Sequence, residues 1–413
     1  MNTKTISRLG STAVAVALLA GLAACGSDDD GGQAASADTI TVWDPYPQHD
    51  ESSEWAGYLD DCAPAGMKVK RTSAATADLL NDLTSAVKAG NAPDVVLLDN
   101  PAVPDAASAG LLASAEDVGM DTSGFDENLA GPGTVDGTTF GVPIGANTLG
   151  LYYNADILAE AGVDPSSITD WASLDAALEA VTAAGFKGIT FSGITGEEGV
   201  FQFLPWFWGA GADLSDLGSD QAVAAGQLVS NWIGQGYAPK SAATDNQSAS
   251  WDLFLTGEYA FAENGSWFAK AASELTDFKA VAMPLPGEQG GAAPVPTGGE
   301  FVAAPLQKKD AEGHYDNAAK LIDCLVGAGN QVKTADALGY FAANADLRAT
   351  QIASDPIWAP WASSIEAAQG RTTDLGPDYT AASGQLSTAL QAAINAAGDQ
   401  DAVSQAFAQA AGN

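Results

Sequence analysis

The chain has few of the residue types that bind metals or carry covalent chemistry. Among its 413 residues only two are histidines and three are cysteines, and no two cysteines form a C-x-x-C pair. A structural zinc site needs several such ligands at short spacing, so the sequence argues against one. It also has neither the G-x-x-x-x-G-K-[ST] loop that cradles phosphates nor the G-x-S-x-G element of hydrolases. We therefore expect no metal ion and no cofactor.

Basic residues are scarce as well. The chain has 16 lysines and arginines against 52 aspartates and glutamates, which gives a formal net charge of -36. A protein this acidic is repelled by nucleic acids and by anionic lipid headgroups. We therefore expect no nucleic-acid partner, and any attachment to a membrane must come from acyl chains rather than from a basic patch.

A long apolar run occurs only near the N-terminus, where Lys4 and Arg8 precede it. The stretch from Ser11 to Ala24 is too short to span a bilayer comfortably, but it has the length of a signal-peptide core. The block Leu22-Ala23-Ala24-Cys25 resembles a bacterial lipobox. That resemblance implies that residues 1–24 are a lipoprotein signal peptide and that Cys25 becomes the lipid-bearing first residue. An ordinary signal peptide with an incidental cysteine is the alternative.

The residues after Cys25 indicate a flexible tether and leave two cysteines to explain. Residues 25–38 are acidic and glycine-rich, without aromatic or large aliphatic side chains that could order them. Loss of Lys4 and Arg8 with the signal peptide would take the charge from -36 to -38. With Cys25 lipidated, Cys62 and Cys324 remain, and two thiols in an exported protein suggest a disulfide. Two buried free thiols are the alternative.

Strand and helix patterns alternate after the tether. The strands are predicted at 39–44 (TITVWD), 67–73 (MKVKRTS) and 94–99 (DVVLLD), and the helices at 53–61, 78–88 and 103–112. This order predicts a mostly parallel sheet with helices on both faces. Ligands of such sheets bind at the carboxyl ends of the strands, where Trp43, Asp44, Asp99 and Asn100 fall. A second α/β region follows, and the last part of the chain is helical.

Aromatic residues are the most informative class, because several follow predicted strands. Trp43 is followed by Tyr46, and Trp206, Trp267 and Trp358 lie in other aromatic segments. Aromatic rings stack on the apolar faces of sugars, while carboxylates and amides bind the hydroxyls. Core packing is the alternative for each tryptophan, and it is favoured for Trp55, Trp171 and Trp232. Trp267 follows "AENGS" at a strand end and is the strongest candidate for a binding site.

Five segments, taken in order, resemble the carbohydrate-specific extracellular solute-binding proteins of ABC importers, which are related to maltose-binding protein. They are "SAVKAGNAPDVVLLDNPAVPDAASAGLL", "FGVPIGANTLGLYYNADILAEAGVD", "FLTGEYAFAENGSWF", "VAMPLPG" and "GGEFVAAP". The resemblance implies an α/β, two-lobed periplasmic-binding-protein-like fold of type II. Each lobe would be a mostly parallel sheet flanked by helices, and hinge crossings would join the lobes. Residues 39–145 and 298–345 would form the N-terminal lobe, and residues 146–297 and 346–413 the C-terminal lobe.

The same resemblance implies which residues contact a ligand held between the lobes. They are Trp43, Asp44, Tyr46, Asp99, Asn100, Asn147, Phe201, Gln202, Trp206, Trp267, Gly299, Glu300 and Trp358. It also places Cys324 on a helix that returns to the lobe holding Cys62, in agreement with a disulfide between them.

The function implied by the resemblance is binding without catalysis. We expect a monomer, anchored through Cys25 on the extracytoplasmic face of the cell membrane. It would capture a sugar or oligosaccharide and deliver it to the permease subunits of an ABC importer by closing. The sequence leaves three alternatives open: a secreted carbohydrate-active enzyme, a binding protein for a peptide, polyol or other osmolyte, and a lipid-anchored adhesin.

Overall fold

The computed structural model describes residues 38–372 and 375–412. The predicted signal peptide, the lipidation residue Cys25 and the tether up to residue 37 lie outside this range. Within the described residues, no helix is both long enough and apolar enough to cross a membrane.

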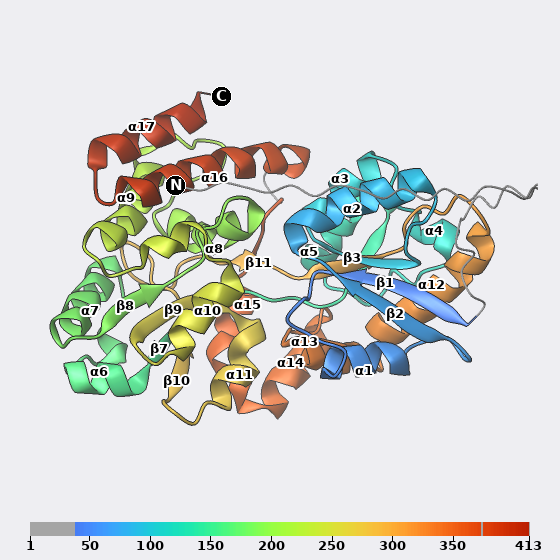
Figure 1. The fold of residues 1–413 in the computed structure, drawn as a ribbon, viewed down its shortest axis with the longest axis horizontal. Coiled ribbons are helices and arrows are strands. Elements are labelled where there is room, and N and C mark those ends of the chain that lie inside the picture. The colour runs from blue at the N-terminus through green and yellow to red at the C-terminus, as the bar shows by residue number, and fades with distance from the viewer. Residues whose placement is uncertain (1–37, 373–374, 413) are drawn as a thin grey trace, which may run out of the picture. The chain divides into compact units, whose positions relative to one another are not determined.

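A five-stranded sheet with helices on both faces forms the first lobe (Figure 1). Its strands are β1 (Thr39–Asp44), β2 (Lys68–Ser73), β3 (Val95–Asp99), β6 (Gly141–Pro143) and β12 (Glu300–Ala303), and a small hairpin adds β4 (Thr134–Val135) and β5 (Thr138–Thr139). Its helices are α1 (Glu54–Asp61), α2 (Thr76–Ala89), α3 (Ala102–Ser108), α4 (Ala115–Val118), α5 (Glu127–Ala130), α12 (Ala311–Val326) and α13 (Gln331–Leu338). The strand order is β2-β1-β3-β12-β6.

Local sequence explains where these elements begin and end. β3 is a run of buried apolar residues that ends at Asp99, and β1 alternates in burial up to Asp44. The hydroxyl of Ser53 accepts a hydrogen bond from the Ala56 amide and so caps α1. α2 ends at Gly90, which takes the left-handed conformation that glycine adopts most readily. Because β1 and β3 are parallel neighbours, both deliver an aspartate to the same edge of the sheet.

Helix α12 brings a distant part of the chain back to the first lobe. In Figure 1 it lies beside the blue strands, and its Leu321 and Leu325 share a hydrophobic cluster with Ile40 of β1. Cys324 on this helix forms a disulfide with Cys62, which follows α1, and their Cα atoms are 5.5 Å apart. This is the pairing that the sequence predicts. A disulfide that closes so long a loop is expected to add about 3–5 kcal/mol to stability.

A four-stranded sheet forms the second lobe (Figure 1). Its strands are β7 (Leu149–Asn154), β8 (Lys187–Thr190), β9 (Tyr259–Gly265) and β10 (Ala280–Met283), and a separate pair is β11 (Pro296–Thr297) with β13 (Gln369–Gly370). Its helices are α6 (Ala155–Ala161), α7 (Trp171–Ala183), α8 (Glu197–Gly209), α9 (Asp220–Gly234), α10 (Gln247–Leu255), α11 (Ala269–Ser273), α14 (Ala345–Ser354), α15 (Ala362–Glu366), α16 (Tyr379–Ala396) and α17 (Gln400–Ala411). The strand order is β10-β7-β9-β8.

Both sheets are mostly parallel, as predicted, and each contains one strand that runs against the others. In the first lobe β1 is parallel to β2 and β3, but β12 is antiparallel to β3 and β6. β12 follows a segment that crosses from the second lobe, so the chain runs through it in the direction opposite to that of its neighbours β3 and β6. In the second lobe β8 and β9 are parallel, whereas β7 is antiparallel to both β9 and β10.

Three segments cross between the lobes and hydrogen-bond to one another. Asn147 and Gly298 exchange backbone hydrogen bonds of 3.0 and 2.8 Å, and Ala146 and Phe341 exchange bonds of 2.8 and 2.7 Å. Glycine is needed at this junction, because a Cβ on Gly298 would lie 2.0 Å from the side-chain oxygen of Asn147. Gly299 adopts φ +112°, a conformation that other residues rarely take. The first sheet thus ends at Pro143 of β6 and resumes at Glu300 of β12, and the second sheet begins at Leu149 of β7.

Candidate functional site

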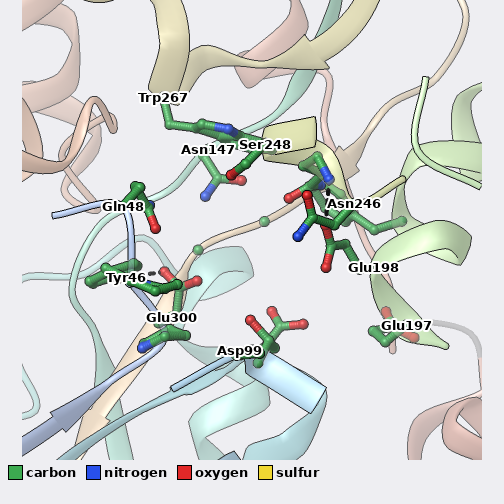
Figure 2. Close-up of a pocket in the computed structure, with 18 of the residues that line it drawn as sticks. Tyr46, Gln48, Asp99, Asn147, Glu197, Glu198, Asn246, Ser248, Trp267 and Glu300 are labelled. Carbon is green, nitrogen blue, oxygen red and sulfur yellow. Dashed lines mark hydrogen bonds between the residues drawn. The ribbon is translucent and has the colours of Figure 1, made fainter. Parts of the chain in front are cut away.

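A cavity lies where the two lobes and the crossing segments meet (Figure 2). The first lobe contributes the loop after β1 and the end of β3, and the second lobe contributes the start of α8, the start of α10 and the turn after β9. The residues that line it are Pro45, Tyr46, Pro47, Gln48, Ala75, Thr76, Asp99, Asn147, Glu197, Glu198, Phe201, Asn246, Gln247, Ser248, Trp267, Phe268, Gly298, Gly299, Glu300, Tyr340 and Arg371.

Glu300 is the first residue of β12 and faces this cavity. Its Oε2 accepts hydrogen bonds from the hydroxyls of Tyr46, at 2.6 Å, and Tyr340, at 2.8 Å. Burial, and then the nearby charge of Asp99, raise the pKa of Glu300 to about 7, although the two tyrosines and Arg371 act in the opposite direction. The carboxyl group therefore changes its charge near neutral pH.

The two tyrosines act as fixed hydrogen-bond donors in the cavity. Burial, and then the charge of Glu300, raise the pKa of both Tyr46 and Tyr340 well above the usual value. Both phenols therefore keep their protons at physiological pH, and both direct them at Glu300. This leaves the other oxygen of Glu300 as the one available for further hydrogen bonds.

Arg371 connects the first lobe to the second through ion pairs. Its Nη1 and Nη2 lie 2.9 and 2.5 Å from the two carboxylate oxygens of Asp99, and Nη1 lies 2.6 Å from Oε1 of Glu197. The guanidinium also stacks 4.9 Å from the ring centroid of Phe201. Burial alone would lower the pKa of Arg371, but the charges of Asp99 and Glu197 raise it above its usual value. The group is a permanent cation with its charge already paired.

Two adjacent glutamates open helix α8 and face the cavity. Glu197 also accepts hydrogen bonds from the hydroxyls of Tyr379, at 2.6 Å, and of Ser383. Oε1 of Glu198 accepts a 2.6 Å hydrogen bond from the Gln247 amide. Burial raises the pKa of both carboxyl groups. The positive end of the helix dipole favours carboxylates at this position, which compensates part of the cost of burying them.

Trp267 supplies an aromatic wall opposite the acidic groups (Figure 2). It lies in the turn after β9, it is half-buried, and it packs against the hydrophobic clusters of both lobes. Its ring centroid is 6.3 Å from that of Phe201. The ring packs against Gly265, where a Cβ would lie 1.9 Å from it. The indole can therefore take this position only because residue 265 is a glycine.

The structure brings seven of the thirteen predicted ligand-binding residues to this cavity and places the other six elsewhere. The seven are Tyr46, Asp99, Asn147, Phe201, Trp267, Gly299 and Glu300. They come from the loop after β1, the end of β3, the crossing segments, α8 and the turn after β9. The other six lie outside the lining of this cavity.

Three of these six residues belong to the first lobe. The side chain of Asp44 is fully buried and pairs with Arg71 instead. The amide of Asn100 is turned to the crossing segment and donates to the carbonyl of Thr297 at 3.1 Å. Trp43 lines a separate groove beside α2. It neighbours Asp44 in β1, and neighbouring residues of a strand point to opposite faces of the sheet.

The other three of these residues are buried in the second lobe. Gln202 and Trp206 share helix α8 with Phe201 but are buried inside the lobe. They come one and five residues after Phe201, and residues at these spacings do not share a face of a helix. Gln202 accepts from the Ser192 amide, and the indole of Trp206 donates to Glu263 at 2.7 Å. Trp358 packs on Phe341, with ring centroids 5.0 Å apart. Core packing, the alternative considered for every tryptophan, accounts for Trp206 and Trp358.

Sequence reasoning missed several polar residues of the site. They include Glu197, Glu198, Asn246, Tyr340 and Arg371. The sequence could have indicated the first two, because a pair of glutamates directly before an aromatic segment is favoured at the start of a helix. Arg371 is a rare cation in an acidic region, but nothing in its neighbourhood predicts that it meets Asp99. Among the described residues, no group of three or more histidine, cysteine, aspartate or glutamate side chains could hold a metal ion.

The comparisons with known proteins agree with this architecture. A family model described as bacterial extracellular solute-binding protein matches residues 63–363. Maltodextrin-binding protein MdxE of Bacillus subtilis is 28% identical over 308 residues, which cover 70% of this chain and 67% of that protein.

Two solved structures show the fold. Maltose-bound MalE3 of T. maritima superposes with a TM-score of 0.76 at 20% identity and covers 91% of this chain and 98% of its own. UgpB from Mycobacterium tuberculosis, solved with glycerophosphocholine, has a TM-score of 0.73 at 24% identity and covers 91% and 97%. The two-lobed α/β fold that the sequence predicts is thereby confirmed. The family model spans most of the chain, and the chain belongs to the bacterial extracellular solute-binding proteins.

Proposed function

We propose that this protein binds a sugar or oligosaccharide in the cavity between its lobes and delivers it to an ABC importer. The observation that carries the proposal is the pairing of a half-exposed indole, Trp267, with hydrogen-bonding side chains across the cavity. An indole face matches the apolar C–H face of a sugar ring. Carboxylates and amides such as those of Glu300 and Asn147 match the hydroxyl groups at its rim.

Closure of the lobes would couple binding to delivery. Asp99 and Tyr46 come from the first lobe, whereas Glu198 and Trp267 come from the second, so a ligand that touches both groups favours the closed arrangement. A ligand shifts such an equilibrium by its difference in affinity for the two states. The permease would then recognise the closed form. No bond is broken in this scheme, and one chain supplies the cavity residues of both lobes.

We also propose that the protein is a lipoprotein, held outside the cell membrane by acyl chains on Cys25. The proposal rests on the lipobox-like block before this cysteine and on the family's extracellular character. Replacing Cys25 with serine in the expressing cell tests it. The variant protein should leave the membrane fraction and no longer incorporate labelled palmitate. Retention of the variant in that fraction would contradict lipid anchoring.

A thermal-shift panel tests the choice of ligand. The full mature protein is heated with mono- and oligosaccharides, polyols, amino acids, short peptides and glycerophosphocholine. A ligand that binds only the folded state raises the midpoint with concentration, by about 2.7 kcal/mol at a hundredfold excess over Kd. We expect saccharides to give the largest shift. A larger shift with a peptide, a polyol or a phosphodiester would overturn the sugar assignment and keep the binding role.

An enzyme is the second candidate, because one observation favours it. A glycosidase needs two neighbouring carboxyl groups, one of them with a raised pKa. Glu300 has a pKa of about 7 and is influenced by Asp99. However, both oxygens of Asp99 are held by Arg371, so this carboxylate is a poor nucleophile or base. Incubation with oligosaccharides should leave them intact, and turnover that Glu300→Gln abolishes would replace the binding proposal.

A further inference from the structure

The cavity has an excess of negative charge that its own residues do not neutralise. Four carboxyl groups line it, those of Asp99, Glu197, Glu198 and Glu300, and among its lining residues Arg371 is the one cation. Figure 2 shows Asp99, Glu198 and Glu300 around one space, with Trp267 on the opposite side.

Both terminal nitrogens of the single guanidinium bind two of these carboxylates. Arg371 holds both oxygens of Asp99 and one oxygen of Glu197, and its side chain is only 1% exposed. The remaining oxygen of Glu197 accepts from Ser383. Within the cavity, Asp99, Glu197 and Arg371 therefore form a closed group with a formal charge of -1, from one cation and two carboxylates.

The other two carboxyl groups each keep an oxygen free toward the cavity. Oε2 of Glu300 takes both tyrosine hydroxyls, and Oε1 of Glu198 takes the Gln247 amide. Among the described residues, the second oxygen of each has no hydrogen-bond donor. Burial is the first cause that raises the pKa of Glu198 and Glu300, and the charge of Asp99 adds to it in both. The protein thus leaves the ionised form of each group uncompensated, and a cation bound beside them would favour that form.

We propose that the ligand is a saccharide that carries a protonated amine, which Glu300 and Glu198 bind while its ring stacks on Trp267. The inference rests on the proposed function and names the ligand class for the same cavity. An ammonium group supplies both the missing charge and up to three donors. A uronic acid of the same shape would place a third uncompensated anion beside these carboxylates and is rejected.

Charge sets the size of the expected preference. A protonated amine brings an ionised donor that also neutralises a carboxylate, whereas a hydroxyl brings a neutral donor. A tenfold change in affinity corresponds to about 1.4 kcal/mol. We therefore expect an amino sugar to bind about tenfold more tightly than the neutral sugar with a hydroxyl at the same carbon.

Matched sets of sugars test the proposal on the full mature protein. Calorimetric titrations at pH 7 compare glucosamine, glucose and glucuronic acid, the corresponding galactose and mannose sets, and the 1,4-linked disaccharides of each. The amino member should bind most tightly within every set that binds, and the uronic acid most weakly. Equal or tighter binding of the neutral member in every set that binds would overturn the charge preference and leave the sugar-binding proposal standing. Binding of no member would contradict sugar binding itself.

A single substitution tests whether Glu300 causes the preference for a protonated amine. Glu300→Gln keeps the size of the side chain and removes its charge, so it should lower the ratio of amino-sugar to neutral-sugar affinity from about tenfold to about threefold or less. Glu160→Gln, on the exposed face of α6, changes the net charge equally far from the cavity and should keep the ratio. A ratio that stays the same in Glu300→Gln would contradict the role of Glu300.

Discussion

Two neighbouring strands of the first sheet each end in an aspartate that holds an arginine, yet the two ion pairs differ in what they connect. Asp44, at the end of β1, lies 2.5 Å from Arg71 of the adjacent strand β2. Asp99, at the end of β3, lies 2.5 Å from Arg371, which is 272 residues further along the chain. Both aspartates occupy the same edge of the same sheet.

The origin of the arginine decides the role of each pair. Arg71 also donates to the backbone carbonyls of Tyr46 and His49, so the first pair fixes the loop after β1 from within one lobe. Arg371 also pairs with Glu197 of the second lobe, so the second pair lies across the cavity and joins both lobes. We infer that the first pair supports folding, whereas the second contributes to the balance between open and closed lobes.

Breaking the pair within the lobe should have the larger effect on stability. Asp44→Asn leaves the charge of Arg71 buried without its partner, and such a loss typically costs about 3–5 kcal/mol. Urea unfolding of the full protein measures it. Asp252→Asn, on the exposed face of α10, is the control and should change stability by less than about 0.5 kcal/mol. Equal effects of the two substitutions would refute the structural role of Asp44.

Breaking the pair across the cavity should act on conformation more than on folding. In Asp99→Asn, Arg371 keeps Glu197, so we expect a smaller loss of about 1–3 kcal/mol in stability. The ligand-free protein should open, which small-angle X-ray scattering detects as a larger radius of gyration. Asp105→Asn removes an acceptor of the exposed cross-lobe hydrogen bond from Thr380 and is the matched control. An unchanged radius in Asp99→Asn would refute the proposed link between the lobes.

Glu300 is expected to add a pH dependence of stability at the same cavity. Its pKa is about 7 in the folded protein, above the ordinary 4.5, so the unfolded chain releases this proton first. The free energy of unfolding should therefore fall as pH rises from about 4.5 to about 7, and this contribution should level off above pH 7. Glu300→Gln should remove about 1–3 kcal/mol of that fall relative to the wild type. The free energy of unfolding of both proteins is measured by chemical denaturation at pH 5, 6, 7 and 8. The same dependence on pH in the wild type and in Glu300→Gln would contradict the raised pKa.

The sequence predicts the part of this site that local patterns determine. The strands that end at Asp44 and Asp99 follow from an alternating pattern and a continuous apolar run, and Trp267 follows from its place after a strand. The local pattern does not distinguish the two aspartates, because both end parallel strands at one edge. Their difference depends on Arg71 and Arg371, and only the folded chain brings the second one near.

The direction of side chains within one helix or irregular segment is the other feature that the sequence does not predict. Phe201 faces the cavity, whereas Gln202 and Trp206 of the same helix are buried in the lobe. Helix α8 is apolar on nearly every face, so its sequence carries no polar stripe that would mark the side toward the cavity. Tyr340 lies in an irregular segment after α13, where no periodicity predicts its direction.

The most direct test of the central claim compares two half-buried tryptophans. Trp267 lines the cavity between the lobes, whereas Trp43 lines the separate groove beside α2. The saccharide that gives the largest thermal shift is titrated by calorimetry into Trp267→Ala and Trp43→Ala. We expect Trp267→Ala to weaken binding by about 2–4 kcal/mol, or about 30- to 1,000-fold, and Trp43→Ala to change the affinity by less than about threefold. An unchanged affinity in Trp267→Ala would contradict the assignment of this cavity as the sugar-binding site.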